Sequence, residues 1–254
     1  MTAQQLSGTT AIVTGASRGF GRGIAIALAQ AGANVVGVAR DRTRLEDLRA
    51  RLGGGFTPVV ADATDPVIAG QLLDEYRPRT LVLNAGATPL PRPLHQHTWQ
   101  TFSRNWEVDV QHVFGWTREA LLRPLEPGSV VIALSSGAAL RGSPLSGGYS
   151  GAKAAIRFIA AYAADESGRA ALGIRFISVL PPAHVGHRPG RRGRGRVRRP
   201  AGHRRRHLPG GLGPGAHAGA RRQGRHRPGR RLRPRSRLVP AHRRRPHPGP
   251  VIPT

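Results

Sequence analysis

Short runs rich in β-branched residues alternate with longer segments of helical spacing from Thr9 to Leu180. This alternation is typical of a parallel sheet that helices cover on both faces. The sequence therefore predicts a doubly wound α/β domain. Strands are expected at residues 10–14, 34–39, 57–61, 80–84, 129–135 and 174–180, and helices at residues 21–31, 43–51, 66–76, 98–125 and 149–168.

A few residues mark the ends of expected helices. Asp65 precedes Pro66, and this pair is typical of an N-cap followed by proline in the first helical turn. Gly32 and Gly168 follow helical segments, and glycine is common just past a helix C-terminus. We therefore expect one helix to begin at Pro66 and two others to end at these glycines.

The charge of the chain is unevenly distributed. The formal net charge is +27, and all 13 acidic residues lie between Asp41 and Glu166, whereas 22 of the 40 basic residues follow position 183. Residues 184–254 also lack Phe, Trp and Tyr, so they cannot bury enough apolar surface to offset the entropy of ordering the chain. The sequence predicts a folded domain over residues 1–183 and a disordered basic tail over residues 184–254.

Several classes of protein are excluded by composition. The absence of cysteine excludes disulfides, thiolate nucleophiles and zinc sites built from cysteine, and it is compatible with a reducing compartment. The longest apolar stretch, residues 154–164, is interrupted by Arg157 and is far shorter than the ~20 residues that span a bilayer. The first residues lack the pattern of a secretory signal. We expect a cytoplasmic protein with neither a membrane span nor a metal site.

A glycine-rich turn follows the first expected strand and leads into the first helix. Glycines let the backbone approach a ligand closely, and the free N–H groups of a helix N-terminus attract phosphate. A turn of this kind can also be an ordinary tight turn with no ligand. The candidate phosphate-binding residues are Gly15, Ser17, Arg18, Gly19, Phe20 and Gly21.

The spacing of these glycines, with Thr14 in front, resembles that of the short-chain dehydrogenase/reductase family. Further matches follow in the family's order over residues 8–181. They are Asp62 with Ala63 after the third strand, Asn84-Ala85-Gly86 after the fourth, Ser136 after the fifth, and the YxxxK motif formed by Tyr149 and Lys153.

This resemblance implies a Rossmann-type fold and an NAD(P)-dependent enzyme that transfers a hydride to or from a small carbonyl or alcohol substrate. It also implies pairing of two copies through the fourth and fifth helices. The implied cofactor contacts, beyond the glycine-rich turn, are Arg40, Asp62, Ala63, Asn84, Ala85, Gly86, Tyr149, Lys153 and Pro181.

The choice of cofactor depends on the residues after the second strand. Family members that prefer NAD place an acidic residue where this chain has Ala39. Arg40 follows it, and Arg18 precedes the second glycine, which resembles the NADP-preferring pattern. A guanidinium group suits a phosphate because it stays charged and donates two parallel hydrogen bonds. NADP is therefore favoured over NAD, the alternative being that both arginines are solvated surface residues.

Tyr149 and Lys153 have the spacing of neighbours on one helical face. An isolated phenol ionises only well above neutral pH. An ammonium ~4 Å away favours the phenolate by about 4 kcal/mol at an effective dielectric of about 20, so the pair suits acid/base work near neutrality. Lys153 is the only lysine in the chain. Ser136 has the family's spacing from Tyr149 and would bind the substrate oxygen, with Ser135 as the competing candidate.

One position departs from the family pattern. The usual asparagine of the proton relay, in the long fourth helix, is replaced by Asp109, and His112 replaces the usual glycine. An ionised carboxylate accepts hydrogen bonds but cannot donate one as an amide does, and Asn105 is an alternative substitute. His112, like His95 and His97, is expected at the surface or in a loop and not as a metal ligand.

The family pattern ends at the sixth strand. Family members continue with a mobile loop, a helix and a seventh strand, whereas residues 184–254 have the composition of GC-rich codons read out of frame. A frameshift near residues 182–187 is one hypothesis, and a catalytically impaired product is its consequence. A second hypothesis is non-specific binding of nucleic acid or another polyanion through the arginines of the tail.

Overall fold

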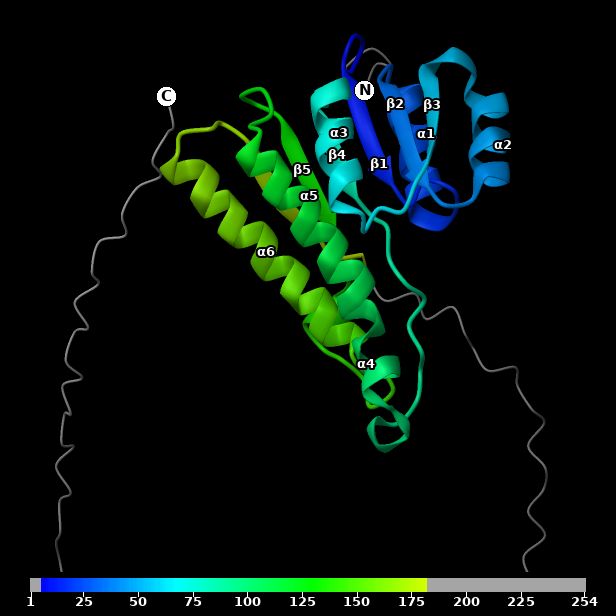
Figure 1. The fold of residues 1–254 in the computed structure, drawn as a ribbon, viewed down its shortest axis with the longest axis vertical. Helices are drawn as coiled ribbons and strands as arrows, with labels where there is room; N and C mark the ends of the chain where they lie inside the picture. The colour runs from blue at the N-terminus through cyan, green and yellow to red at the C-terminus, as the bar shows by residue number, and fades with distance from the viewer. Residues whose placement is uncertain (1–5, 182–254) are drawn as a thin grey trace, which may run out of the picture. The chain divides into compact units, whose positions relative to one another are not determined.

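The computed structural model describes residues 6–181 of the 254-residue chain. Within this range, the strands form one parallel sheet in the order β3-β2-β1-β4-β5-β6 (Figure 1). The predicted doubly wound sheet is confirmed. The strands are β1 (Thr10–Thr14), β2 (Asn34–Ala39), β3 (Phe56–Val60), β4 (Thr80–Leu83), β5 (Val130–Leu134) and β6 (Arg175–Val179).

The direction in which strands are added reverses between β1 and β4. The chain first moves outward from β1 through β2 to β3, and it then returns to the other side of β1 for β4, β5 and β6. Ile12 of β1 pairs with Val36 of β2 on one side and with Leu81 of β4 on the other. The loops after β1 and β4 therefore diverge, and they open a crevice at the carboxyl edge of the sheet, where doubly wound proteins bind ligands.

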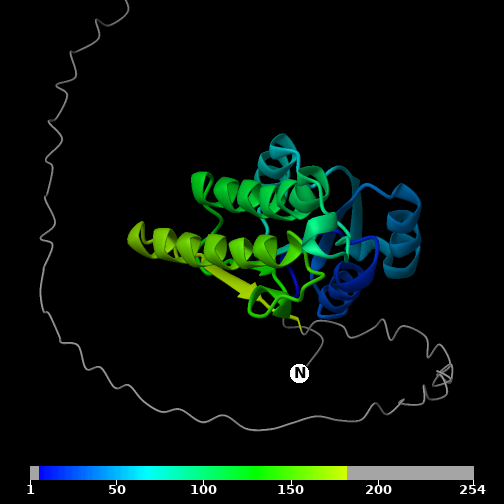
Figure 2. The same cartoon turned by 90° about the horizontal axis from the view of Figure 1, so that it is seen from below.

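Helices cover both faces of this sheet (Figure 2). On one face, Leu45 and Leu48 of α2 are fully buried together with residues of α1. On the other face, Trp116 of α5 and Ile156 of α6 are fully buried in a core that also includes residues of α3. The helices are α1 (Gly19–Gln30), α2 (Arg42–Leu52), α3 (Pro66–Tyr76), α4 (Trp99–Asn105), α5 (Gln111–Leu122) and α6 (Tyr149–Arg169).

The expected signals at helix ends are confirmed in part. The Asp65 side chain accepts a hydrogen bond from the Val67 N–H at 2.9 Å, and α3 begins at Pro66. Gly32 has a φ of +93° just after α1, as expected of a helix terminator. The expectation for Gly168 is wrong, because α6 continues through it, and the left-handed residue that follows the helix is Ala171.

The predicted fourth helix, residues 98–125, is not one continuous α-helix. A π-helical segment, η3 (Trp106–Val110), joins α4 to α5. A π-turn accommodates an extra residue and is frequent at functional sites. It contains Asp109, whose side chain is buried, so the irregular turn lies where the sequence departs from the family pattern.

β6 is an edge strand of the described sheet. Phe176 packs into the core beside α6, whereas Ile177 and Val179 point to the α1 side and are 44% and 41% exposed. The predicted end of the domain at residue 183, the disordered tail over 184–254 and the hypothesised frameshift lie outside the described residues. None of the helices in residues 6–181 has the length and apolar character needed to cross a bilayer.

Candidate functional site

A cavity of about 720 Å³ lies along the carboxyl edge of β1, β2, β3 and β4. The loops after all four strands contribute to it, as the reversal of strand order at β1 and β4 requires. Its lining contains most of the residues predicted to contact the cofactor. They are Gly15, Ser17, Arg18, Gly19, Arg40, Asp62, Ala63, Asn84, Ala85 and Gly86.

The glycine-rich turn is tight on one side and open on the other. A Cβ added to Gly21 would lie 2.2 Å from the carbonyl oxygen of Gly15, so no larger residue fits without moving the turn. Gly19 has a φ of +56°, and a Cβ added there would meet nothing within 4 Å. The packed side explains the need for glycine, and the open side leaves room for a phosphate to approach the N-terminus of α1.

Thr14 ties this turn to the loop after β4. Its hydroxyl accepts hydrogen bonds from the N–H groups of Asn84 at 2.9 Å and Ala85 at 3.2 Å. In return, the Asn84 side chain donates to the carbonyl of Thr14 at 3.1 Å. These reciprocal bonds fix the two sides of the crevice at the point where β1 and β4 diverge.

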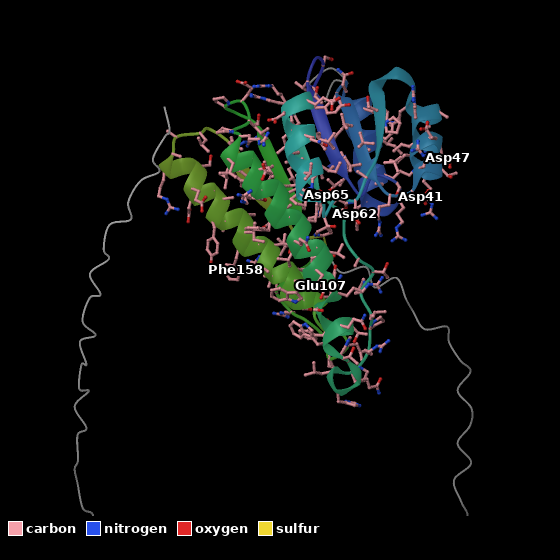
Figure 3. The ribbon with its side chains drawn as sticks, viewed as in Figure 1. Asp41, Asp47, Asp62, Asp65, Glu107 and Phe158 are labelled. Atoms are coloured by element: carbon pink, nitrogen blue, oxygen red, sulfur yellow. The ribbon has the colours of Figure 1, made fainter. Side chains whose placement is uncertain are left out.

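The end of the cavity beside β2 is rich in charge. Arg40 lies 3.7 Å from the carboxylate of Asp62, and Arg44 lies 3.3 Å from that of Asp41. The backbone N–H of Thr64 is the largest cause that lowers the pKa of Asp62. Burial opposes it, and the Thr64 hydroxyl, Arg40 and His112 lower the pKa further by smaller amounts. Asp62 therefore stays ionised, and its carboxylate accepts hydrogen bonds from both the N–H and the hydroxyl of Thr64. Figure 3 labels Asp41 and Asp62 near this edge of the sheet.

A second cavity, of about 410 Å³, contains the predicted catalytic residues. Tyr149, Lys153, Ser136 and Asp109 all line it, together with Phe20 and Pro181 from the predicted cofactor set. Tyr149 begins α6 and Lys153 follows one turn later, with its ammonium 5.7 Å from the centre of the phenol ring. The second cavity shares Asn84 and Gly86 with the first. The two cavities therefore adjoin at the loop after β4.

The two candidate serines differ in their contacts. The hydroxyl of Ser135 donates a hydrogen bond of 2.7 Å to the carbonyl oxygen of Lys153, which ties β5 to α6. The hydroxyl of Ser136 accepts a hydrogen bond of 3.2 Å from the Ala138 N–H and lines the second cavity, where its proton can be donated to a ligand. The geometry favours Ser136 as the residue that contacts a substrate.

Asp109 forms a buried ion pair with Lys153. Its carboxylate lies 3.1 Å from the ammonium, and the two side chains are only 1% and 9% exposed. The same carboxylate accepts a hydrogen bond of 2.7 Å from the Ala87 N–H and faces the side-chain amide of Asn105 at 3.4 Å. Lys153 also donates to the carbonyl of Leu134 at 3.1 Å. Asp109 and Asn105 thus occupy one network, with the acidic residue in direct contact with the lysine.

The family model of short chain dehydrogenases matches residues 9–185. The chain belongs to the short-chain dehydrogenase/reductase family. Members of this family are NAD(P)-dependent oxidoreductases, and the fold and the order of motifs agree with that assignment.

Known members of the family give the extent of the similarity. An uncharacterized short-chain type dehydrogenase/reductase of Sinorhizobium fredii is 34% identical over 67% of this chain and 68% of its own length. The L-xylulose reductase of Mus musculus is 37% identical over 42% of this chain, but the match spans only 44% of the mouse enzyme. The structure of a 3-ketoacyl-(acyl-carrier-protein) reductase from Brucella melitensis, complexed with NADH, is similar with a TM-score of 0.62 and 28% identity, covering 70% of this chain and 77% of that one.

The expectation that His112 lies at the surface or in a loop is wrong. The residue lies on α5 and is fully buried, because this face of the helix packs against β1 and β4. Burial, followed by the positive charge of Lys153, lowers the pKa of His112 to about 3, while the Ala85 backbone and Asp62 act in the opposite direction. The imidazole is therefore neutral at physiological pH. His95 is exposed in the loop before α4, as expected.

Sequence reasoning missed two residues that belong to this short-chain dehydrogenase site. Arg44 lines the first cavity, and the signal for it was the run of alternate arginines, Arg40, Arg42 and Arg44, after the second strand. Trp116 donates a hydrogen bond of 2.9 Å to the carbonyl of Ala63 in the loop after β3. No sequence motif indicated that contact, because it depends on how α5 packs. Residues 6–181 contain no group of three or more His, Cys, Asp or Glu residues that could hold a metal ion.

Proposed function

We propose that this chain is an NADP-dependent oxidoreductase that transfers a hydride between the nicotinamide and a small carbonyl or alcohol substrate, with Tyr149 as the acid/base. The observation that carries the proposal is that Tyr149, Lys153 and Ser136 line one cavity, which adjoins the larger cavity of about 720 Å³ lined by the glycine-rich turn after β1. Membership of the family and a reductase structure solved with NADH support the same chemistry.

Each side chain in the second cavity has a distinct role in this proposal. Bound NADPH supplies the hydride. The phenol of Tyr149 gives its proton to the substrate oxygen as that oxygen becomes an alcohol, and the Ser136 hydroxyl hydrogen-bonds to the same oxygen and polarises the carbonyl. The Lys153 ammonium stabilises the phenolate that remains. In the oxidation direction the same groups act in reverse, with the phenolate as the base.

The proposed role of Asp109 is to hold Lys153 in place. Every contact of its carboxylate suits an ionised acid, because the ammonium, the Ala87 N–H and the Asn105 amide can all donate to it. A negative charge so close to the ammonium also offsets part of its field at the phenol. The site therefore has a precisely placed lysine whose effect on Tyr149 is weaker than that of an unpaired one.

The preference for NADP rests on three arginines. Arg18, Arg40 and Arg44 all line the first cavity, and Arg40 and Arg44 follow β2, where the adenosine ribose of a bound dinucleotide would lie. The two acidic residues in this lining are each paired with an arginine: Asp41 with Arg44 and the N-terminus of α2, and Asp62 with Arg40. The three guanidinium groups outnumber the two carboxylates beside them, and their positive charge favours a 2′-phosphate over a hydroxyl.

Pairing of two copies through α5 and α6 is also proposed. Phe114 on α5 is 55% exposed, and Phe158 and Tyr162 on α6 are 57% and 60% exposed. The rings of Phe158 and Tyr162 lie side by side, 6.0 Å apart, and Figure 3 shows Phe158 pointing away from the body of the domain. Clustered aromatic side chains on a surface mark a protein interface.

The domain boundary and the tail remain proposals based on sequence. We assign catalysis to residues 1–183 and non-specific binding of polyanions to residues 184–254, whose 22 basic residues are all arginine. Binding of this kind is steeply salt-dependent, because it releases counterions from the polyanion.

The test uses the full-length chain. Titration with NADPH and NADH should give saturable binding that favours NADPH by about tenfold or more, and a reactive aldehyde such as 4-nitrobenzaldehyde should be reduced at the expense of NADPH. A folded sample without saturable NADPH binding would overturn the proposal. In that case, binding to unrelated DNA that weakens steeply as the salt concentration rises would support polyanion binding by the tail as the function of the chain.

A further inference from the structure

His112 reaches the cofactor cleft only through another residue. It lies on α5, is fully buried, and is absent from the lining of both cavities. Its Nε2 lies 3.0 Å from the hydroxyl oxygen of Thr14, the last residue of β1. The Nδ1 atom has no hydrogen bond of ordinary geometry among the described residues, but the Ala85 backbone acts on the imidazole as a hydrogen-bond partner, so Thr14 and Ala85 are both polar neighbours of this side chain.

The hydroxyl of Thr14 has four polar partners within hydrogen-bonding distance, although it has only one proton to donate and two lone pairs to accept with. Its two lone pairs accept from the N–H groups of Asn84 and Ala85. Its single proton can go to the carbonyl of Val82 at 3.2 Å or to the Nε2 of His112. A neutral imidazole gives that proton a second acceptor, and the hydroxyl oxygen stays turned toward the loop after β4.

The position of this loop matters for the glycine-rich turn. A Cβ added to Gly15 would lie 2.8 Å from the Asn84 side-chain nitrogen and 2.9 Å from the Cα of Ala85, so the turn and the loop are in close contact. Any displacement of Asn84 or Ala85 therefore moves the surface on which a pyrophosphate would rest. One helical turn beyond His112, the Trp116 ring meets the imidazole edge-on, with the ring centroids 6.3 Å apart. Trp116 also donates its indole N–H to the carbonyl of Ala63 in the loop after β3.

We infer that His112 is a positioning residue for the dinucleotide. It acts through Thr14 to hold the Asn84–Ala85 segment against the glycine-rich turn, and with Trp116 it makes α5 the common support of the loops after β1, β3 and β4. Family members with glycine in place of His112 have no side chain to make this contact. The inference rests on the proposed function, because it concerns the affinity for NADP(H).

The test compares His112→Phe with His112→Gln in the full-length chain. Phenylalanine fills the space without a polar atom, whereas the amide of glutamine can present an oxygen near the position of Nε2. His112→Phe should weaken NADPH binding about fivefold, the value of one hydrogen bond of ~1 kcal/mol, and His112→Gln should remain within about twofold of the wild type. Without cofactor, the amides of Asn84 and Ala85 should exchange hydrogen faster in His112→Phe alone.

A control and a double-mutant cycle separate this role from general packing. Val113→Ala removes buried methyl groups next to His112 and should lower stability without changing NADPH affinity or the exchange of Asn84 and Ala85. If His112 acts through Thr14, the double variant Thr14→Val/His112→Phe should bind NADPH no more weakly than Thr14→Val alone.

Additive losses in the cycle, or wild-type affinity and exchange in His112→Phe, would overturn the inference. If the wild-type chain does not bind NADPH, the proposed function is overturned instead. The role of His112 in holding the loop is then decided by whether the amides of Asn84 and Ala85 exchange hydrogen faster in His112→Phe than in the wild type.

Discussion

The buried imidazole of His112 should make the fold sensitive to mild acid. Its pKa is lowered from 6.5 to about 3, first by burial and then by the charge of Lys153, which the Ala85 backbone and Asp62 oppose only in part. In the unfolded chain the same side chain binds a proton at its ordinary pKa of about 6.5. Between these two values the unfolded state holds the proton and the folded state does not.

The sign and the size of the effect follow from this difference. A histidine whose pKa is depressed on folding costs nothing above pH 6.5, and its cost grows as the pH falls until it levels off near pH 3. Each pH unit in that window lowers the free energy of unfolding by ~1.4 kcal/mol. Moving from pH 7 to pH 5 should therefore remove about 2 kcal/mol through His112 alone.

The measurement is urea unfolding of the wild type and of His112→Gln at pH 7 and pH 5, followed by tryptophan fluorescence. The wild type should lose about 2 kcal/mol more than the variant over this interval. The matched control is His95→Gln, which changes an exposed histidine and should follow the wild type. Equal losses in the wild type and His112→Gln would refute the reasoning, because they would show that the imidazole does not stay neutral in the fold.

Other predictions concern the two cavities. Gly21→Ala should weaken NADPH binding at least about tenfold, because its Cβ would clash with the carbonyl oxygen of Gly15. The control is Gly23→Ala, where a Cβ meets nothing within 4 Å and NADPH should bind normally in the same titration. Arg40→Ala should weaken the binding of NADPH by about tenfold and leave that of NADH unchanged, as measured by calorimetry. In the reduction assay, Asp109→Asn should move the alkaline limb of the pH–rate profile to lower pH by about one unit, because removal of the carboxylate charge lets the ammonium stabilise the phenolate more strongly. An unchanged limb would contradict that role.

The strands and most of the first cavity could be predicted because each depends on local sequence. β1 and β2 have the expected bounds, since runs of buried β-branched residues leave little freedom. The glycine-rich turn could also be predicted, because a position where any side chain would clash with the backbone must be glycine, and Gly21 marks such a position in the sequence.

The remaining features depend on packing between distant segments. The π-helical segment that places Asp109 beside Lys153 could not be read from helical periodicity, because both residues belong to helices that look regular in sequence. His112 was misplaced for a similar reason. A polar residue in a helix is normally predicted to be exposed. The partner that lets His112 be buried, Thr14, lies 98 residues away in the chain and so gives no local signal.

The central claim is that Tyr149, activated by Lys153, exchanges the proton with the substrate. The most direct measurement is the rate of NADPH-dependent reduction of 4-nitrobenzaldehyde by Tyr149→Phe, alongside NADPH affinity, with Tyr162→Phe as the control for loss of a phenol at an exposed site. Loss of turnover by about a hundredfold or more, with NADPH affinity retained and Tyr162→Phe fully active, is the predicted result. Turnover in Tyr149→Phe equal to that of the wild type would contradict the account.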